Sequence, residues 1–412
     1  MPFFIWPQAL SAIFEQIVLN MKKLFWSLAV LCAFNTYAQV DLINKVKDNQ
    51  GAGADAYQFK EVINVEAGPV SDQGRSSTCW SFSTVSFLET EYLRQNKKFI
   101  DLSELYVVRK TYELKAEKYI RMHGRINFAQ GGALPDALMV LQSFGALPQA
   151  VYSGLPTGQT QINHDELETA LKAVLDAVLK NEGKTISNTW KTSVNALLDA
   201  YMGAVPNEFN WEGKKYSPRS FADQVLKISA SDYIQITSFT HQPYYTSMFI
   251  EVPDNWMWGT AYNLPLNDLM ECVNHALSQN HSLAWATDVS EKGFNIRKGL
   301  AVNPDRQAAA ALGLDDIFLP GFPELQVDEA LRQKSFDNWE TTDDHGMQIT
   351  GISEDQNGKR FYLVKNSWGE LENPFYKNGY LYASESFVKH KTISFVLHKK
   401  ALPKAIARQL GL

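Results

Sequence analysis

The sequence predicts an α+β fold in which a helical half faces an antiparallel β half, and three patterns lead to this prediction. After Cys79, apolar residues recur at steps of three and four, which predicts an amphipathic helix that ends at about Asn96. Far downstream, the strand-like runs 343–352 and 361–369 flank an Asn-Gly turn and predict a β-hairpin. A third run, 282–288, has the composition of a buried strand.

The residues before the predicted domain contain the pattern of an export signal. Residues 21–38 have a basic start, an apolar middle and a small-residue exit, with cleavage expected after Ala38. The apolar run is too short to span a bilayer, so no membrane association is expected after its removal. Residues 1–20 precede a second methionine and fit a start site assigned too far upstream. We therefore expect a periplasmic or extracellular protein whose N-terminal segment is 39–61.

Further helices and strands are predicted in order along the chain. Ser103 can cap a helix that runs to about Met122, and the glycine pair Gly131-Gly132 precedes a helix that closes near Gly145. The final strand is expected to end near Lys399. Periodic apolar stripes predict four more helices, at 167–179, 192–201, 267–279 and, in the C-terminal tail, 403–410.

Composition and charge exclude several classes of function. A chain of 412 residues that is 45% apolar can form one large domain or two ordinary ones with sizeable cores. Removing residues 1–38 takes away two lysines and one glutamate and changes the formal charge from −6 to −7, which leaves no basic surface for nucleic acid. His and Cys are not clustered at metal-ligand spacing, so neither a metal nor another cofactor is expected.

Cys79 is the candidate nucleophile. A thiol in the first turn of a helix lies beside unpaired backbone N–H groups and the positive end of the helix dipole, and both favour the thiolate. Ser76, Ser77 and Thr78 are expected to supply capping hydroxyls. On the helix start alone, an ordinary buried cysteine is an equally good interpretation. A disulfide with Cys272 is a further alternative, although the apolar stripe around Cys272 favours a buried thiol there.

His345 and Asn366 supply the other groups that a thiol nucleophile needs. The midpoint between them falls between Asp355 and Gln356, inside the predicted turn, so strand pairing would place them opposite one another with backbones about 5 Å apart. Taken singly, each has an ordinary structural interpretation. Together they can act as base and orienter in thiol acyl transfer. Cys79 would be the nucleophile, and Gln73, six residues before it, would be the oxyanion donor.

At these residues the chain resembles the papain-like cysteine peptidases, and within them the bleomycin hydrolase and aminopeptidase C branch. The resemblance runs from about Val62 to Pro403 and implies a peptidase domain over 62–400, a C-terminal tail over 401–412 and peptide substrates. It implies that Gly131 and Gly132 bind the substrate backbone and that Trp368 shields the Asn366–His345 pair. The motifs that carry it are Gln73, Cys79-Trp80, Gly131-Gly132, the strand around His345, and Asn366-Ser367-Trp368-Gly369.

The spacing of the motifs indicates a large insertion. Papain relatives place the histidine roughly 130–150 residues after the cysteine, whereas 266 residues separate Cys79 from His345 here. We expect the extra residues at 152–264, mainly as helices. This insertion, and the short stretch 39–78 that has no room for an inhibitory prosegment, favour an aminopeptidase. In that branch a C-terminal arm meets the substrate amine and the enzyme is a hexamer; the sequence leaves open whether this shorter tail reaches the cleft.

The same residues are also compatible with three other functions. A papain-like endopeptidase is the runner-up to the aminopeptidase. A thiol transferase of transglutaminase type would normally carry aspartate where Asn366 stands. A non-catalytic peptide-binding relative is disfavoured because Gln73, Cys79, His345 and Asn366 are all present.

Overall fold

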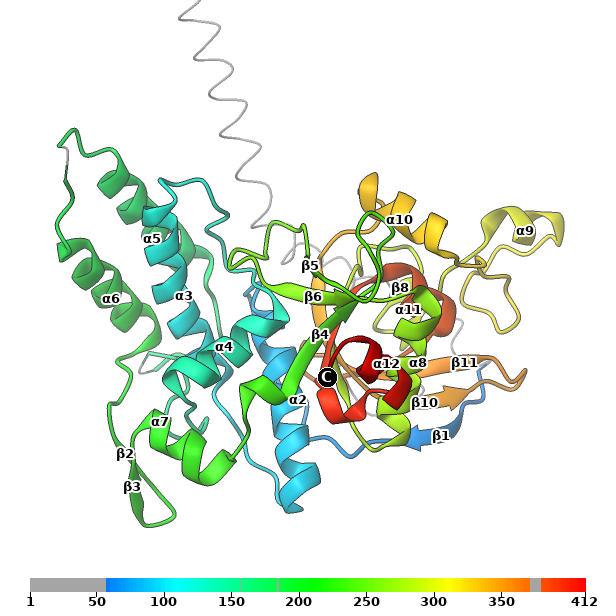
Figure 1. Cartoon of the computed structure of the whole chain (residues 1–412), viewed down its shortest axis with the longest axis horizontal. Helices are drawn as coiled ribbons and strands as arrows, with labels where there is room; N and C mark the ends of the chain where they lie inside the picture. Colours follow the sequence, from blue (N-terminus) through cyan, green and yellow to red (C-terminus); the bar gives the residue numbers. More distant parts are fainter. Residues whose placement is uncertain (1–56, 157, 184, 371–378) are drawn as a thin grey trace, which may run out of the picture.

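The computed structural model describes residues 57–156, 158–183, 185–370 and 379–412. The predicted export signal at 21–38, residues 1–20 and most of the segment 39–61 lie outside the described residues. The described chain forms a group of helices beside one large sheet, with helix α2 between them (Figure 1). None of its helices is both long enough and apolar enough to cross a membrane.

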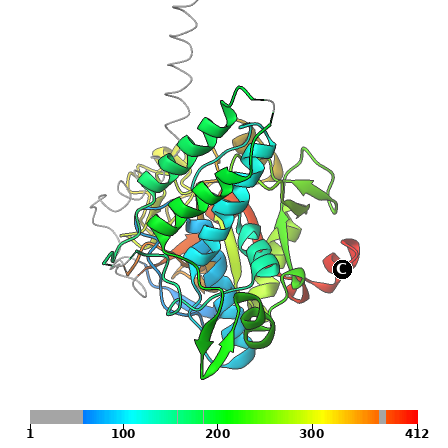
Figure 2. The same cartoon turned by 90° about the vertical axis from the view of Figure 1, so that its left-hand side faces the viewer.

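The helical half forms where the sequence predicts it. Ser103 accepts a hydrogen bond from the Tyr106 N–H at the start of α3, and Gly145, at φ +84°, ends α4. In Figure 2, α5 and α6 run side by side across the outer face of this half. The main helices are α2 (Cys79–Asn96), α3 (Glu104–Arg121), α4 (Leu134–Phe144), α5 (Asp165–Leu179) and α6 (Thr189–Met202); the short helix α7 (Pro218–Phe221) follows the hairpin of β2 (Phe209–Trp211) and β3 (Lys214–Tyr216).

The β half is built on a single sheet with the order β5-β6-β4-β13-β7-β10-β11-β12-β9-β8, and β1 pairs with β10 outside this path. Within the described residues its pairs are antiparallel except β4 with β6 and β9 with β12. The strands are β1 (Lys60–Asn64), β4 (Tyr233–Thr237), β5 (Ser247–Phe249), β6 (Thr260–Asn263), β7 (Leu283–Thr287), β8 (Phe294–Asn295), β9 (Leu300–Ala301), β10 (His345–Glu354), β11 (Arg360–Lys365), β12 (Tyr380–Ser384) and β13 (Thr392–His398).

Helices cover both faces of the sheet. Because successive strand residues point to opposite faces, alternate residues of β7 enter two different cores. Ala284 and Ala286 pack with α2, whereas Leu283 and Trp285 pack with α8 (Leu266–Ser278). Helix α8 therefore lies on the face of the sheet opposite α2. The remaining helices are α9 (Arg306–Ala311), α10 (Glu329–Asp337), α11 (Glu385–Lys391) and α12 (Lys404–Gln409).

The C-terminal tail packs on the α8 face. Strand β13 ends at His398, and the Ala401 carbonyl lies 2.9 Å from Nδ1 of His275 on α8. Ile406 of α12 is buried in the core that contains α8, and Leu410 packs against the same core. The predicted short helix is confirmed, but Ala405, which we expected on its apolar side, is exposed. The tail is thus held on the far side of the sheet from α2.

The insertion differs from its prediction in its second part. The segment 152–264 is helical only as far as 226. From Tyr233 onward it supplies β4, β5 and β6, which extend the sheet beyond β13. The physical reason is that β4 gives partners to the backbone groups of β13, which would otherwise form an open sheet edge. These strands have only three to five residues, which is too few for an alternating apolar pattern to be recognised in the sequence.

The β10–β11 hairpin also differs from its prediction. The Asp355 carbonyl accepts a hydrogen bond from the Gly358 N–H at 2.9 Å, and Gly358 adopts φ +76°. A glycine in this left-handed position lengthens the loop beyond a two-residue turn. Glu354 therefore pairs with Arg360, and the turn is centred on Asn357. The register shift near Thr350 offsets this displacement by only one residue, so His345 and Asn366 do not lie directly opposite one another.

Candidate active site

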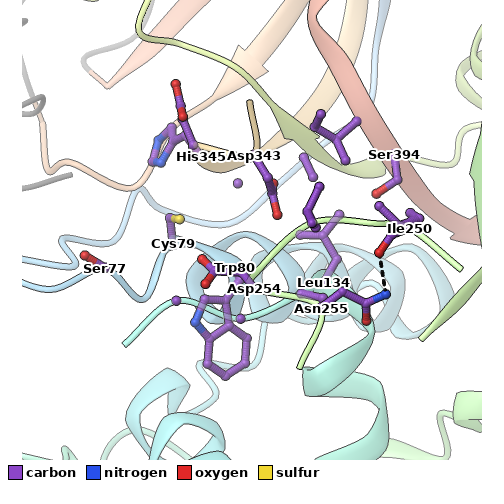
Figure 3. Close-up of a pocket in the computed structure, with 18 of the residues that line it drawn as sticks. Ser77, Cys79, Trp80, Leu134, Ile250, Asp254, Asn255, Asp343, His345 and Ser394 are labelled. Atoms are coloured by element: carbon purple, nitrogen blue, oxygen red, sulfur yellow. Dashed lines mark hydrogen bonds between the residues drawn. The ribbon is translucent and has the colours of Figure 1, made fainter. Parts of the chain in front are cut away.

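A pocket with about 490 Å³ of open space lies where the start of α2 meets the sheet. It is closed on one side by residues from the connection between β5 and β6 (Figure 3). The helical half contributes Cys79, Trp80, Gly131 and Gly132, and the sheet contributes His345 and Ser394. Asp343 and Asp344 come from the segment just before β10, and the β5–β6 connection contributes Ile250, Val252, Asp254 and Asn255.

Cys79 is the first residue of α2 and is 6% exposed at the pocket. The predicted side-chain cap is absent: Thr78 makes no capping bond, because its hydroxyl is 2.6 Å from Oγ of Ser76, which is also bonded to the Gln73 carbonyl. The N-cap side chain therefore accepts no hydrogen bond from the first N–H groups of the helix. The positive end of the helix dipole stays directed at the thiol and favours its ionised form.

His345 lies at the start of β10 with its imidazole beside the Cys79 thiol (Figure 3). Its Nε2 is 2.7 Å from Oδ1 of Asn366, and the same oxygen accepts the Ser367 N–H at 2.8 Å. Since Oδ1 accepts both bonds, Nε2 carries the proton and Nδ1 is left to interact with the thiol. The Trp368 ring covers the imidazole, with centroids 4.6 Å apart.

Burial dominates the electrostatics of His345. The side chain is 2% exposed, and desolvation lowers its pKa to about 4. The Asn366 hydrogen bond and the charge of Asp344 act in the opposite direction. The imidazole is therefore neutral at pH 7 while the thiol is protonated. An ion pair between them forms only if the charge of the Cys79 thiolate offsets the free-energy cost of burying the imidazolium.

Gln73 lies in the loop before Cys79 and is not among the residues that line the pocket. It is fully buried; its amide nitrogen donates to the Ser76 carbonyl at 2.7 Å, and its Oε1 accepts from the Ser367 hydroxyl at 2.8 Å. One of its two amide N–H groups is used by Ser76. Gln73 thus ties the loop before Cys79 to the segment that carries Asn366.

Gly131 and Gly132 lie in the pocket because neither position has room for a side chain. A Cβ on Gly131 would lie 1.9 Å from Oδ2 of Asp254, and one on Gly132 would lie 2.8 Å from Cε2 of Trp80. Of the seven predicted site residues, the pocket lining contains Cys79, His345, Gly131 and Gly132; Asn366 and Trp368 lie behind His345, and Gln73 lies in the loop before Cys79.

Three aspartates in the pocket lining, Asp254, Asp343 and Asp344, were not predicted as site residues. Burial raises the pKa of Asp343 well above its usual range, and the charges of Asp254 and Asp344 add to this shift. Burial also raises the pKa of Asp254, against the opposing effect of Lys115 and a hydrogen bond from Asn127. The position of Asp343 two residues before His345 was a signal that could have identified it. Asp254 lies in the insertion, where no sequence motif marks it.

Cys272 takes no part in this site. It is completely buried on α8, and neither Cys79 nor Cys272 is in a disulfide, as predicted for Cys272. Burial raises the pKa of the Cys272 thiol, so it is the less reactive of the two. Across the described ranges, no three or more His, Cys, Asp or Glu side chains are arranged to hold a metal ion.

Comparison with known proteins identifies the family. Residues 116–411 match the model of the Peptidase C1-like family, and residues 55–169 match the papain family cysteine protease model. Aminopeptidase C of Lactobacillus delbrueckii subsp. lactis is 22% identical over 388 residues, covering 84% of this chain and 83% of the relative. Cysteine proteinase 1, mitochondrial, of Saccharomyces cerevisiae is 22% identical over 431 residues, covering 92% and 84%.

A solved structure shares the fold. The crystal structure of PepW from Lactobacillus rhamnosis superposes with a TM-score of 0.68 at 18% sequence identity, covering 94% of this chain and 93% of PepW. This likeness confirms the predicted α+β fold of papain type. Because the family model spans most of the chain, the protein belongs to the Peptidase C1-like family and is a cysteine-type peptidase.

Proposed function

We propose that this protein is an exported cysteine aminopeptidase whose nucleophile is Cys79. The observation that carries the proposal is the 2.7 Å hydrogen bond between Nε2 of His345 and Asn366, which leaves Nδ1 available to the thiol in the pocket. Peptide substrates follow from this chemistry, because a thiol paired with an oriented imidazole is the arrangement that acyl transfer requires.

The reaction proceeds in two steps. Nδ1 of His345 takes the thiol proton, and Sγ of Cys79 attacks the scissile carbonyl carbon. The oxyanion is stabilised by the Cys79 N–H and by the second N–H of the Gln73 amide. The imidazolium then donates its proton to the leaving amine, which leaves an acyl-enzyme. Water, deprotonated by His345, attacks the acyl carbon and restores the thiol.

Removal of N-terminal residues is favoured over internal cleavage because relatives that span most of the chain are aminopeptidases C. An endopeptidase is the second candidate, and one observation favours it. The C-terminal tail packs against α8 on the face of the sheet opposite α2, so it is not the arm that the resemblance implies.

Export is proposed from residues 21–38 alone, which have the three parts of a secretory signal. N-terminal sequencing of the protein recovered outside the cytoplasm should begin at Gln39. Recovery of the whole protein in the cytoplasm, with residues 21–38 still attached, would refute this part of the proposal.

The catalytic assignment is tested with Cys79→Ala, and Cys272→Ala is the matched control. We expect Cys79→Ala to abolish hydrolysis of peptides with a free N-terminus and to keep the unfolding temperature, because alanine is well tolerated in a first helical turn. Iodoacetamide should label Cys79 and spare Cys272. Retained activity in Cys79→Ala, or equal labelling of both thiols, would show that the nucleophile lies elsewhere.

A further inference from the structure

Residues 250–259, which connect β5 to β6 and are called the strap below, cross from the sheet to the helical half. The Trp256 indole N–H donates to Oδ2 of Asp136 on α4 at 2.7 Å, and Asn127 donates to Oδ1 of Asp254 at 2.8 Å. The ammonium of Lys118 on α3 lies 3.6 Å from the centroid of the Trp258 ring. Figure 1 shows this connection reaching from β5 and β6 toward α4. The strap therefore bridges the two halves of the molecule.

The strap is held in one shape by its own hydrogen bonds. The amide of Asn255 donates to the carbonyls of Ile250 and Gly259, each at 2.8 Å, and its Oδ1 accepts from the Gly259 N–H at 2.7 Å. The buried Asn255 side chain thus replaces the partners that the strap's backbone would have in a sheet. With both ends in the sheet and its middle bonded to α4, the strap is a fixed wall rather than a mobile loop.

This wall closes one end of the active-site pocket. Four residues of the strap line the pocket together with Cys79, and the carboxylate of Asp254 lies directly over Gly131. An extended peptide that is cut internally needs an open groove on both sides of the nucleophile. A closed end accepts a chain terminus instead. The geometry therefore favours cleavage near one end of the substrate, without any contribution from the C-terminal tail.

The charges in the closed end decide which terminus fits. Asp254, Asp343 and Asp344 line the pocket, and Asp136 and Glu168 lie near Asp254. Lys115 interacts with Asp254, Asp136 and Glu168, and its ammonium donates to the carbonyls of Ala129 and Gly131. Within the described ranges, Asp343 has no hydrogen-bond donor or ion-pair partner. Figure 3 shows it pointing into the pocket. This excess of carboxyl groups attracts a cationic group and repels a terminal carboxylate.

We propose that Asp343 and Asp254 bind the α-ammonium group of the substrate's N-terminal residue, so that the strap and these two carboxylates restrict the enzyme to N-terminal cleavage. This inference rests on the proposed aminopeptidase function and names the residues that determine its specificity. The raised pKa values of the two carboxyl groups agree with it: burial raises both, and the charges of Asp254 and Asp344 add to the shift of Asp343, so a bound cation would stabilise the ionised forms.

The test compares an aminoacyl amide with a free amine, such as an alanyl aminocoumarin, with its N-acetylated form. Asp254→Asn and Asp343→Asn remove each charge with little change in shape, and in the first variant the new amide oxygen can still accept the bond from Asn127. Asp315→Asn, an exposed site outside the pocket lining, is the control for net charge. We expect each pocket variant to lose ~10–100-fold in kcat/KM on the free amine, mainly through KM, because a charged hydrogen-bond partner is lost. The control should match the wild type.

The outcomes separate this inference from the proposed function. If the wild type cleaves the acetylated substrate as readily as the free amine, the aminopeptidase proposal fails. If the wild type prefers the free amine and both pocket variants keep that preference, the function stands and the two carboxylates are not its cause. An equal loss on both substrates would indicate a structural role, and a loss confined to lysyl side chains would indicate side-chain selection. Both results would overturn the inference. Unfolding temperatures and Cys79 labelling rates confirm that the variants are folded.

Discussion

His345 and Asn366 are hydrogen-bonded at 2.7 Å although the β10–β11 ladder does not place them opposite one another. The register shift near Thr350 and the end of β11 at Lys365 let Asn366 turn toward the imidazole from a diagonal position. Trp368 then covers the pair. The contact depends on how the strand ends rather than on direct cross-strand pairing.

Replacing Asn366 with alanine should lower kcat/KM without abolishing it. The substitution removes the acceptor that keeps the proton on Nε2 of His345, so the wrong tautomer and other ring orientations become populated. We expect a loss of ~10–100-fold, part of the 10²–10⁴ that general base catalysis typically contributes. Asn366→Asp keeps an acceptor and should lose less. Parental kinetics in Asn366→Ala would show that His345 is oriented by other groups.

Replacing Gln73 with alanine should reduce both turnover and stability. Loss of one oxyanion donor typically costs ~10²–10³ in kcat. The structure adds a second effect, since Gln73 is the hydrogen-bond partner of the Ser76 carbonyl and the Ser367 hydroxyl. Leaving buried groups unpaired should lower the free energy of unfolding by about 1–3 kcal/mol.

Ser367→Ala is the control for this variant, because it removes one partner of Gln73 and leaves the amide N–H groups in place. It should be destabilised and keep most of its turnover in the same steady-state assay. Full turnover in Gln73→Ala would place the oxyanion site at other donors.

Deleting residues 408–412 should leave the cleavage positions on a peptide unchanged. If the tail were the arm that the resemblance implies, its deletion would shift cleavage toward internal bonds, but Leu410 packs on the α8 face of the sheet, opposite α2. The deletion should only lower the unfolding temperature by a few degrees, as should Leu410→Ala in the full chain. Mass spectrometry of a digested peptide mixture measures the positions. New internal cuts in the deletion variant alone would show that the tail reaches a cleft.

Glu168→Gln should become more stable relative to the wild type as pH rises. Burial raises the pKa of Glu168 to about 7, against the effects of Lys115 and the Gln130 N–H. A carboxyl group with a raised folded-state pKa contributes stability below its unfolded value, near pH 4.5, and loses that contribution as pH rises through 7. The advantage of the glutamine variant should therefore grow by about 3 kcal/mol between pH 4.5 and 8.

Urea unfolding of both proteins at several pH values measures this difference, and the other titrating groups cancel in the comparison. A constant difference across the range would mean that the pKa of Glu168 is the same in the folded and unfolded protein.

The helices of the site were predictable because their signals are local. The apolar repeat of α2, the Ser103 cap of α3 and the Gly145 stop of α4 each lie within or next to their helix, which is why these helices begin and end close to their predicted positions. Cys79, His345 and Asn366 could also be recognised as candidate site residues from nearby sequence, because each lies next to a recognisable helix start or strand.

The α+β class, the candidate nucleophile at a helix start and the histidine strand could be predicted from the sequence, because they depend on short-range periodicity and on side-chain chemistry. The hairpin register, the burial of Gln73, the position of the tail and the strap that brings Asp254 over Gly131 became apparent only in the folded chain. Each of these depends on which distant segment supplies a hydrogen-bond partner or an apolar surface. Contacts between residues far apart in the chain leave no period in the sequence from which they can be predicted.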